Sequence, residues 1–269
     1  MLDEASLATY RSDGCVVIRG LFSADEVETV RRGIDRNLAD PGPLFGVASR
    51  DDDPGRFVED FCNWQRIPEY REIAFGSRAA DVAGALMGGS VVRLYHDHLL
   101  VKEPGTRQHT PWHQDQPYYN VEGFDNCSMW MPVDPVPRES TLEFLAGSHR
   151  EGWLMPRTFL TEQARWFPDG SLEEIPDIEA DRDAFDIRGW ALEPGDAVYF
   201  HMLTAHHAYG VPGRHRRRAF SLRFLGDDAT HAPRPWRTSP PFDGLDEELP
   251  PGAPMDHPLF PVLRTRTPG

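Results

Sequence analysis

The sequence predicts an α+β protein that is mainly β, with helices toward the N-terminus and an antiparallel jelly roll after them. Two observations carry this prediction. Helical periodicity and helix-capping signals occur before about residue 90, and several short apolar runs separated by glycine, proline and aspartate follow it. Short strands without long helices between them are typical of an antiparallel sandwich or barrel rather than of a parallel, doubly wound sheet.

The N-terminal part, about residues 1–90, is expected to supply helices that pack on the core. The β-branched run CVVIRGLF favours a short strand that leads into the first helix. Ser23 and Glu26 then form a capping-box pattern, and apolar residues follow it at helical spacing: Val27, Val30, Ile34 and Leu38. A second helix is predicted over residues 78–87, ending at a glycine pair.

The jelly-roll core is predicted over about residues 91–226. Its strands are expected in the runs VVRLYHDHLLVKEP, SMWMPVDPV, STLEFLAGS, GDAVYFHML and RRAFSLRFLG. Residues 151–188 lack strand alternation and mix aromatic with acidic side chains, which favours a lid over one mouth of the barrel. Residues 227–269 are proline-rich, so we expect an extended tail along the surface. The chain, 1–269, is interpreted as a single domain.

Composition and charge exclude several classes of protein. With 39% hydrophobic and 11% aromatic residues the chain can bury a sizeable core, which excludes disorder throughout. The net charge of -15 repels phosphate backbones, so no nucleic-acid partner is expected. Three scattered cysteines, an N-terminus without an apolar leader and the lack of a long apolar segment favour a cytoplasmic protein without membrane insertion. We expect a small molecule as its partner.

The strongest chemical signal is the run PWHQDQPYY, which places His113 and Asp115 two positions apart. On a strand, side chains at this spacing project from one face, so an imidazole and a carboxylate can reach one metal ion. The run FHMLTAHHAYG adds His201, His206 and His207. A non-haem iron site needs two imidazoles and one carboxylate on one face of an octahedron, and spacing alone leaves open which of the three histidines completes it.

Several segments match one known family in order along the chain. They are WHQDQPYY, LEFLAGSHREG, GDAVYFH and RRRAFSLRF, and the opening DGCVVIRGLFSADEV. Together they resemble the phytanoyl-CoA dioxygenase family of Fe(II)/2-oxoglutarate-dependent oxygenases. The resemblance implies a double-stranded β-helix (jelly-roll or cupin-like) core. It also implies Fe(II), 2-oxoglutarate and O2 as cofactor and co-substrates, and hydroxylation of a small organic molecule with release of succinate and CO2.

The resemblance also assigns residues. In the family's pattern the distal ligand lies six residues after the phenylalanine of an FH pair, which makes His206 the third ligand beside His113 and Asp115. The arginine that pairs with the far carboxylate of 2-oxoglutarate lies eleven residues further on, at Arg217, and a guanidinium fork suits a carboxylate. Other positions expected near the co-substrate are Gln114, Trp130 and Lys102. Where the family commonly has a serine that helps to bind 2-oxoglutarate, this chain has Ala208.

Alternation on the run RRAFSLRF supports an inward Arg217, although the basic run that contains it could also be solvated. Arg217 shares a face with Ala219, Ser221 and Arg223, and small neighbours suit a pocket wall; the other face carries Arg218, Phe220, Leu222 and Phe224.

The substrate side and the type of reaction are less determined. Residues that flank the metal-binding run could contact a substrate: His98, Tyr95, Gln116 and Tyr118. Related halogenases have alanine or glycine in place of the acid, so Asp115 favours hydroxylation. Two alternatives stay open at this point: a metal-dependent, cupin-like enzyme that uses no 2-oxoglutarate, and a non-catalytic jelly roll that binds a ligand.

Overall fold

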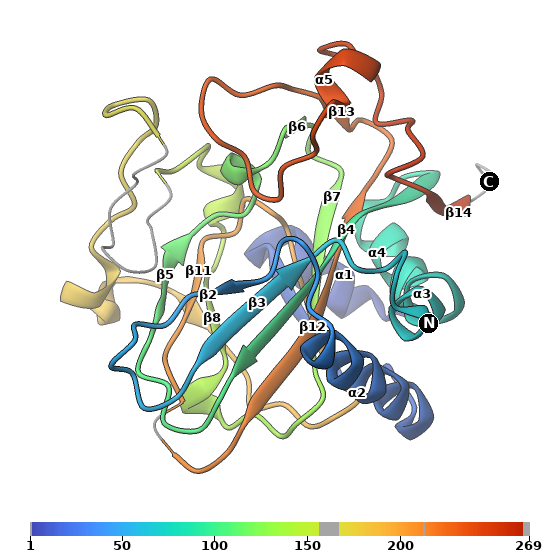
Figure 1. Ribbon diagram of the computed structural model, residues 1–269. Coiled ribbons are helices and arrows are strands. Elements are labelled where there is room, and N and C mark those ends of the chain that lie inside the picture. The colour runs from blue at the N-terminus through green and yellow to red at the C-terminus, as the bar shows by residue number, and fades with distance from the viewer. Residues whose placement is uncertain (1, 156–166, 212, 266–269) are drawn as a thin grey trace.

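Two antiparallel sheets pack face to face in the computed structural model, which describes residues 2–155, 167–211 and 213–265 (Figure 1). The larger sheet runs in the order β1 (Cys15–Ile18), β10 (Ala197–Phe200), β7 (Asn126–Pro132), β12 (Arg217–Leu225), β4 (Val91–Lys102), β3 (Phe57–Phe61) and β2 (Gly46–Val47). An eighth strand, β14 (Val262–Thr265), pairs with the start of β4. The smaller sheet contains β5 (Thr110–His113), β11 (His206–Ala208), β8 (Leu142–Leu145) and β9 (Ile187–Arg188).

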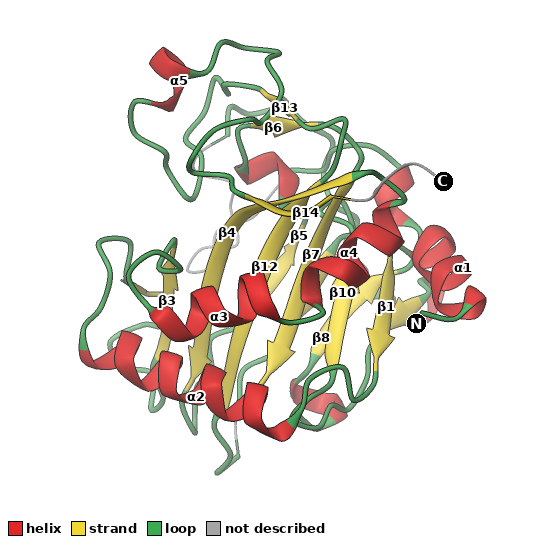
Figure 2. Cartoon of the chain, turned by 90° about the vertical axis from the view of Figure 1, so that its right-hand side faces the viewer, coloured by secondary structure: helices red, strands yellow, loops and turns green. Residues whose placement is uncertain are grey.

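Helices cover the outer face of the larger sheet. They are α1 (Glu4–Asp13), α2 (Ala24–Ala39), α3 (Pro68–Gly76) and α4 (Ala79–Met87), and Figure 2 shows α2, α3 and α4 in front of the strands. The capping box at Ser23 and Glu26 is present, and Gly88 ends α4 with a left-handed φ of 82°, so both predicted helices are confirmed. The helices α1 and α3 were not predicted, because each is short and only weakly amphipathic.

Alternation along the strands separates two layers of apolar packing. On the helix side, Leu99, Met129 and Phe220 belong to one buried cluster that includes the apolar faces of the helices. On the opposite side, Trp130 and Phe200 pack against residues of the smaller sheet such as Phe144. The predicted architecture, α+β and mainly β with a jelly-roll core and N-terminal packing helices, is therefore confirmed.

The two segments outside the core strands pack more closely than expected. Residues 227–265 contain β13 (Thr230–His231), which pairs with β6 (Val121–Glu122), and the short helix α5 (Leu245–Glu248). This segment and residues of the core form one buried cluster, so it is a packed layer rather than only an extended tail.

The segment predicted to form a lid includes residues 156–166, which lie outside the described residues. Ile175 and Ile178 pack against the smaller sheet, and β9 extends that sheet. Phe167 contacts Tyr118 with ring centroids 5.5 Å apart. The lid itself stays a prediction. Within the described ranges, the helices are all too short or too polar to cross a membrane.

Candidate metal centre

Two histidines and one aspartate converge between the sheets. His113 ends β5, and His206 begins β11 directly opposite it in the sheet. The Nε2 atoms of His113 and His206 lie 3.6 Å and 3.7 Å from Oδ1 of Asp115. One donor atom from each residue lies within 4.8 Å of the other two. Two imidazoles and one carboxylate around a single point are the facial donor set that suits non-haem Fe(II).

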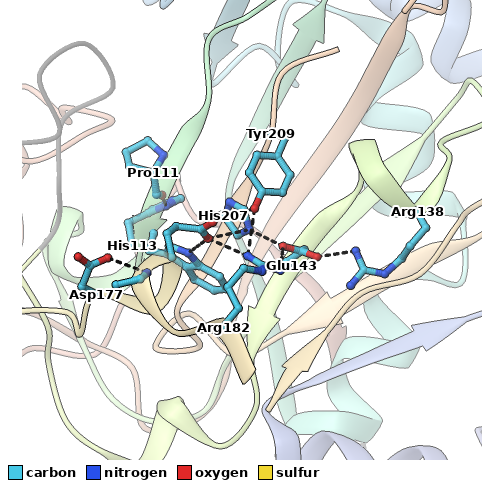
Figure 3. Close-up of polar contacts among 11 residues, drawn as sticks. Pro111, His113, Arg138, Glu143, Asp177, Arg182, His207 and Tyr209 are labelled. Atoms are coloured by element: carbon cyan, nitrogen blue, oxygen red, sulfur yellow. Dashed lines mark hydrogen bonds and ion pairs between the residues drawn. The ribbon is translucent and has the colours of Figure 1, made fainter. Parts of the chain in front are cut away.

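The backbone fixes the tautomer of both histidines. Nδ1 of His113 lies 2.8 Å from the carbonyl oxygen of Pro111, a contact drawn in Figure 3, and Nδ1 of His206 lies 2.9 Å from the carbonyl oxygen of Thr204. A carbonyl oxygen can only accept, so each Nδ1 carries the proton and each Nε2 keeps its lone pair. Burial, and then the neighbouring His113, lower the pKa of His206 to about 3, which keeps its imidazole neutral.

Asp115 reaches the site from a turn, which corrects the expectation that one strand carries both neighbouring ligands. The strand β5 ends at His113, and Asp115 has helical backbone angles of φ -73° and ψ -45° just before a single 3₁₀ turn (Gln116–Tyr118). The amide N–H of Asp115 donates to the carbonyl oxygen of Met202 at 2.8 Å. This hydrogen bond ties the turn to the loop that precedes His206.

The second oxygen of Asp115 is held by residues that the sequence did not reveal. Nε of Arg223 lies 3.0 Å from Oδ2 of Asp115, and the hydroxyl of Ser128 donates to the same oxygen at 3.0 Å. Arg223 also donates to the hydroxyls of Tyr119, at 3.1 Å, and Ser221. Because Oδ2 is occupied in this way, Oδ1 is the oxygen that faces the histidines.

These contacts determine the charge of Asp115. Burial by itself would raise the pKa of this carboxyl group. The guanidinium of Arg223 outweighs burial and holds the pKa of Asp115 well below its usual range. The aspartate is therefore an anion, as a metal ligand has to be.

Two buried cations lie side by side on the larger sheet, toward the end of β4 and the start of β12. Lys102 and Arg217 are directly paired across β4 and β12 and are only 1% and 5% exposed. Nζ of Lys102 donates to the carbonyl oxygens of Gln108 and Tyr209 at 2.8 and 3.1 Å, and Arg217 donates to that of Ser140.

Neither Lys102 nor Arg217 forms an ion pair with a carboxylate of the described residues. Burial lowers the pKa of both side chains, that of Arg217 to about 10. Unpaired buried charges are strongly unfavourable, and a carboxylate on a ligand would remove the imbalance.

Trp130 and Gln114 lie near these groups in different ways. Trp130 belongs to the buried layer between the sheets, and the guanidinium carbon of Arg217 lies 5.9 Å from its ring centre. Gln114 is fully buried, and its amide donates to the carbonyl oxygens of Gly152 and Leu203 and accepts from the N–H of Leu154. The hydrogen-bonding groups of Gln114 are therefore committed to the backbone, and the structure gives it no free group for a co-substrate.

The four predicted substrate residues divide into two pairs. His98 lies on the inner face of β4, and the ring of Tyr118 lies 6.2 Å from that of His113. Tyr95 is 1% exposed and donates to Asn120 within the cluster around the C-terminal segment. Gln116 is equally buried, and its amide donates to Gly123. The structure keeps His98 and Tyr118 as candidates and gives Tyr95 and Gln116 packing roles instead.

A polar network centred on the buried side chains of Glu143 and His207 supports the two ligand strands from behind. His207 and Trp112 are the chain neighbours of His206 and His113. Figure 3 shows His207 beside Glu143, whose carboxylate lies 2.6 Å from Nε2 of the imidazole. Glu143 also accepts from Arg138 at 2.6 Å and from Arg182 at 2.7 Å.

The network reaches the segment that follows the undescribed residues. Glu179 accepts hydrogen bonds from Trp112 at 2.9 Å and from Arg182 at 2.8 Å. Burial alone would raise the pKa of Glu143, but His207, Arg182 and Arg138 lower it to about 2. The residues behind the metal-binding strands are thus tied to residues 179–182 by charged contacts.

Comparisons with known proteins identify the family of the chain. The family model for phytanoyl-CoA dioxygenase (PhyH) matches residues 10–219. An ectoine dioxygenase of Stutzerimonas stutzeri strain A1501 is 28% identical over 243 residues, covering 83% of this chain and 77% of that protein. The peroxisomal phytanoyl-CoA dioxygenase of Mus musculus is 25% identical over 235 residues, covering 81% of this chain and 67% of the mouse protein.

Solved structures share the fold. The non-haem α-ketoglutarate-dependent carbocyclase SnoK from nogalamycin biosynthesis superposes with a TM-score of 0.75 at 24% identity, covering 97% of this chain and 96% of SnoK. EctD from S. alaskensis, solved with 2-oxoglutarate and 5-hydroxyectoine, gives 0.68 at 22% identity, covering 98% and 87%. Since the family model spans most of the sequence, the resemblance noted from the motifs is confirmed, and the chain belongs to the phytanoyl-CoA dioxygenase family.

Proposed function

We propose that this chain is a non-haem Fe(II)- and 2-oxoglutarate-dependent dioxygenase that hydroxylates a small organic molecule. The observation that carries the proposal is the pairing of two features inside one barrel. Two Nε2 lone pairs and one carboxylate oxygen face a common point. Two buried cations, which have no carboxylate partner among the described residues, lie next to each other on the larger sheet. A metal ion suits the first feature and a dicarboxylic co-substrate suits the second.

The residues of the chain then have distinct tasks. His113, Asp115 and His206 would hold the iron, which when bound supplies the activation of oxygen. Arg217 binds the far carboxylate of 2-oxoglutarate, and Lys102 beside it adds a second positive charge near that carboxylate. Three protein ligands leave the remaining positions for 2-oxoglutarate and O2. The reaction converts a substrate C–H bond, O2 and 2-oxoglutarate into an alcohol, succinate and CO2.

The surrounding residues orient these groups. Arg223 and Ser128 hold Oδ2 of Asp115 and leave Oδ1 free to face the two imidazoles. Gln114 fixes the backbone between the two ligands, and Trp130 packs beside the guanidinium of Arg217. Such contacts behind the ligands fix their orientation and tune metal affinity.

The substrate is a small molecule that enters beside His98 and Tyr118. The relatives named above differ in the substrates that their names state, so family membership does not select one substrate. We retain the cytoplasm as the compartment, because all three cysteines are free thiols and two of them are buried. The strongly negative net charge continues to argue against nucleic acid as a partner.

Consumption of 2-oxoglutarate tests this proposal. The Fe(II)-loaded protein is expected to convert 2-oxoglutarate to succinate in the presence of O2, at a slow rate without substrate. Asp115→Ala should abolish succinate formation, whereas Asp243→Ala, at an exposed aspartate of the C-terminal segment, should leave it unchanged.

Other outcomes of the same assay point to the alternatives. Firm Fe(II) binding without succinate formation or 2-oxoglutarate binding would favour a cupin-like metal enzyme. A protein that binds no iron would favour a non-catalytic ligand-binding jelly roll.

A further inference from the structure

The inner face of the larger sheet is open to solvent at one side. Cross-strand pairing places Glu59 beside Leu100 and Phe61 beside His98, on the face that also carries Ala219. Glu59, Phe61 and Leu100 are partly exposed, although they point between the sheets. Ala219 on the same face is 1% exposed. Solvent, and therefore a ligand, reaches the barrel interior at β3 and β4.

Glu59 presents a carboxylate at this opening that forms no ion pair with a lysine or arginine of the described residues. Its side chain is 20% exposed, and its one polar neighbour among the described residues is His98, with Oε2 3.6 Å from Nε2. That separation is too long for a hydrogen bond. The nearest buried cation along the sheet, Lys102, lies within electrostatic reach of Glu59, but its Nζ donates to two backbone carbonyl oxygens instead of pairing with that carboxylate.

His98 does not neutralise this charge. Its side chain is 10% exposed, and its Nε2 is shielded from solvent without a hydrogen-bond partner among the described residues. Burial lowers the pKa of His98, so the imidazole is neutral near pH 7. Its ring stacks on Phe61 with centroids 3.9 Å apart, which holds Nε2 toward Glu59.

The carboxylate of Glu59 lies within electrostatic reach of a side chain that is next to the metal ligands. Burial raises the pKa of Tyr118 most, followed by the carboxylates of Asp115 and Glu59 and then by Tyr119. The ring of Tyr118 in turn lies 6.2 Å from that of His113. Tyr118 therefore lies within electrostatic reach of both carboxylates, and a molecule oxidised at the metal would occupy the region that Glu59 faces.

Filling this region with substrate changes the surroundings of Glu59. The carboxylate is solvated while the site is open, and a bound molecule would displace that water. A buried charge without a partner is unfavourable by several kcal/mol, and an alkyl chain offers it no hydrogen bond. A cationic N–H group would both pair with the charge and donate to the free oxygen and nitrogen atoms.

We propose that Glu59, with His98 beside it, selects substrates that carry a protonated nitrogen, such as an ammonium or amidinium group, near the carbon that is oxidised. This inference rests on the proposed function. Arg223 and Arg217 do not compete for Glu59, because Arg223 is paired with Asp115 and Arg217 donates to Ser140. The net charge of -15 also favours the approach of cations over anions.

Two probes of the same shape test this assignment. The Fe(II)- and 2-oxoglutarate-loaded protein is titrated without oxygen with benzylammonium or with benzyl alcohol, and the shift of the iron-to-2-oxoglutarate charge-transfer band gives each Kd. Benzylammonium is expected to bind at least about tenfold more tightly than benzyl alcohol, as one charge pair predicts. Glu59→Gln keeps the shape of the side chain and should reduce this preference to less than about threefold.

A variant that removes a different carboxylate serves as the control. Glu103→Gln removes a charge just beyond the end of β4, where Glu103 pairs with Arg216 on the surface, and should keep the preference. Absent binding of benzylammonium, equal binding of the two probes, or a preference that survives in Glu59→Gln would overturn the assignment. The charge-transfer band with 2-oxoglutarate alone, before any probe is added, tests the proposed function separately. If this band is present and the probe experiment fails, only the role of Glu59 is wrong.

Discussion

Nε of Arg223 lies 3.0 Å from Oδ2 of Asp115, the carboxylate oxygen that does not face the two histidines. The side chains of Arg223 and Asp115 are only 5% and 7% exposed. The ion pair is therefore shielded from water, where charge-assisted hydrogen bonds are strong. Its geometry restricts Asp115 to binding a metal through one oxygen, and this leaves more positions open for co-substrates.

Arg223→Gln is expected to weaken Fe(II) binding about 10- to 100-fold, because contacts behind a ligand set its orientation. Ser128→Ala removes the neutral hydrogen bond to the same oxygen and should have a smaller effect in the same direction. Anaerobic titration with Fe(II) measures both. Arg218→Gln is the matched control, since Arg218 points to the other face and pairs with Asp134. Unchanged affinity in both site variants would contradict a positioning role.

Arg217→Met should raise the Kd for 2-oxoglutarate at least about 30-fold, because it removes the buried fork that receives the far carboxylate. Lys102→Met should give a smaller loss, since Lys102 presents a point charge rather than a fork. Thermal unfolding provides a second readout. Excess 2-oxoglutarate should raise the melting temperature of the Fe(II)-loaded parent but not that of Arg217→Met. An equal rise in both proteins would show that the co-substrate binds elsewhere.

Glu143→Gln is expected to loosen the segment behind the metal-binding strands. It leaves Arg138, Arg182 and His207 without their shared anion, and because both arginines are partly exposed and screened by solvent, we expect a loss of about 1–3 kcal/mol of unfolding free energy. Hydrogen exchange should increase in residues 177–188, and Fe(II) should bind more weakly because His207 adjoins His206.

Glu139→Gln, at an exposed position on the same loop as Arg138, is the control for the Glu143 variant. Normal hydrogen exchange in residues 177–188 of Glu143→Gln would show that the network does not hold this segment.

The metal-free protein is expected to lose stability in mild acid through His201. Its Nε2 donates to the carbonyl oxygen of Phe124 at 2.8 Å, and its Nδ1 accepts from the N–H of Leu203 at 3.0 Å, so both nitrogens are satisfied in the neutral ring. Burial lowers the pKa of His201 to about 4. An unfolded histidine titrates near pH ~6.5.

Between these two pKa values the unfolded chain binds the proton and the folded chain does not. Stability contributed by neutral His201 is therefore complete above about pH 6.5 and falls by up to about 1.4 kcal/mol per unit as the pH decreases toward 4. Urea unfolding at several pH values measures this slope. His201→Asn keeps an acceptor for the N–H of Leu203. It should reduce the slope of unfolding free energy against pH by up to the contribution of one proton, whereas an unchanged slope would assign the effect to other groups.

Local signals in the sequence were enough to single out His113 and Asp115, and the family resemblance then selected His206. His113, Asp115 and His206 lie in recognisable runs, and the capping box of α2 was visible in the same way. Side-chain direction was harder to predict: Gln114 lies between two ligands in sequence but points toward backbone carbonyl oxygens. The turn at Asp115 also breaks the strand alternation that was expected to align it with His113.

Contacts that depend on the order of the strands could not be predicted. Arg223, Ser128 and Glu59 lie on β12, β7 and β3, and they meet the site because the sheet places these strands in register around β4. No short motif marks them. Arg223 and Ser128 matter because they are buried against Asp115, and Glu59 because its carboxylate faces the barrel interior; neither can be read from the sequence alone.

The central claim is that His113, Asp115 and His206 bind Fe(II) and that Arg217 holds 2-oxoglutarate beside it. Anaerobic titration of the Fe(II)-loaded protein with 2-oxoglutarate tests it most directly. A visible charge-transfer band is expected in the parent and in His257→Ala, lost in His206→Ala, and weakened in Arg217→Ala but not in Arg218→Ala. A parent protein that binds iron yet shows no band, or a band that persists in His206→Ala, would contradict the claim.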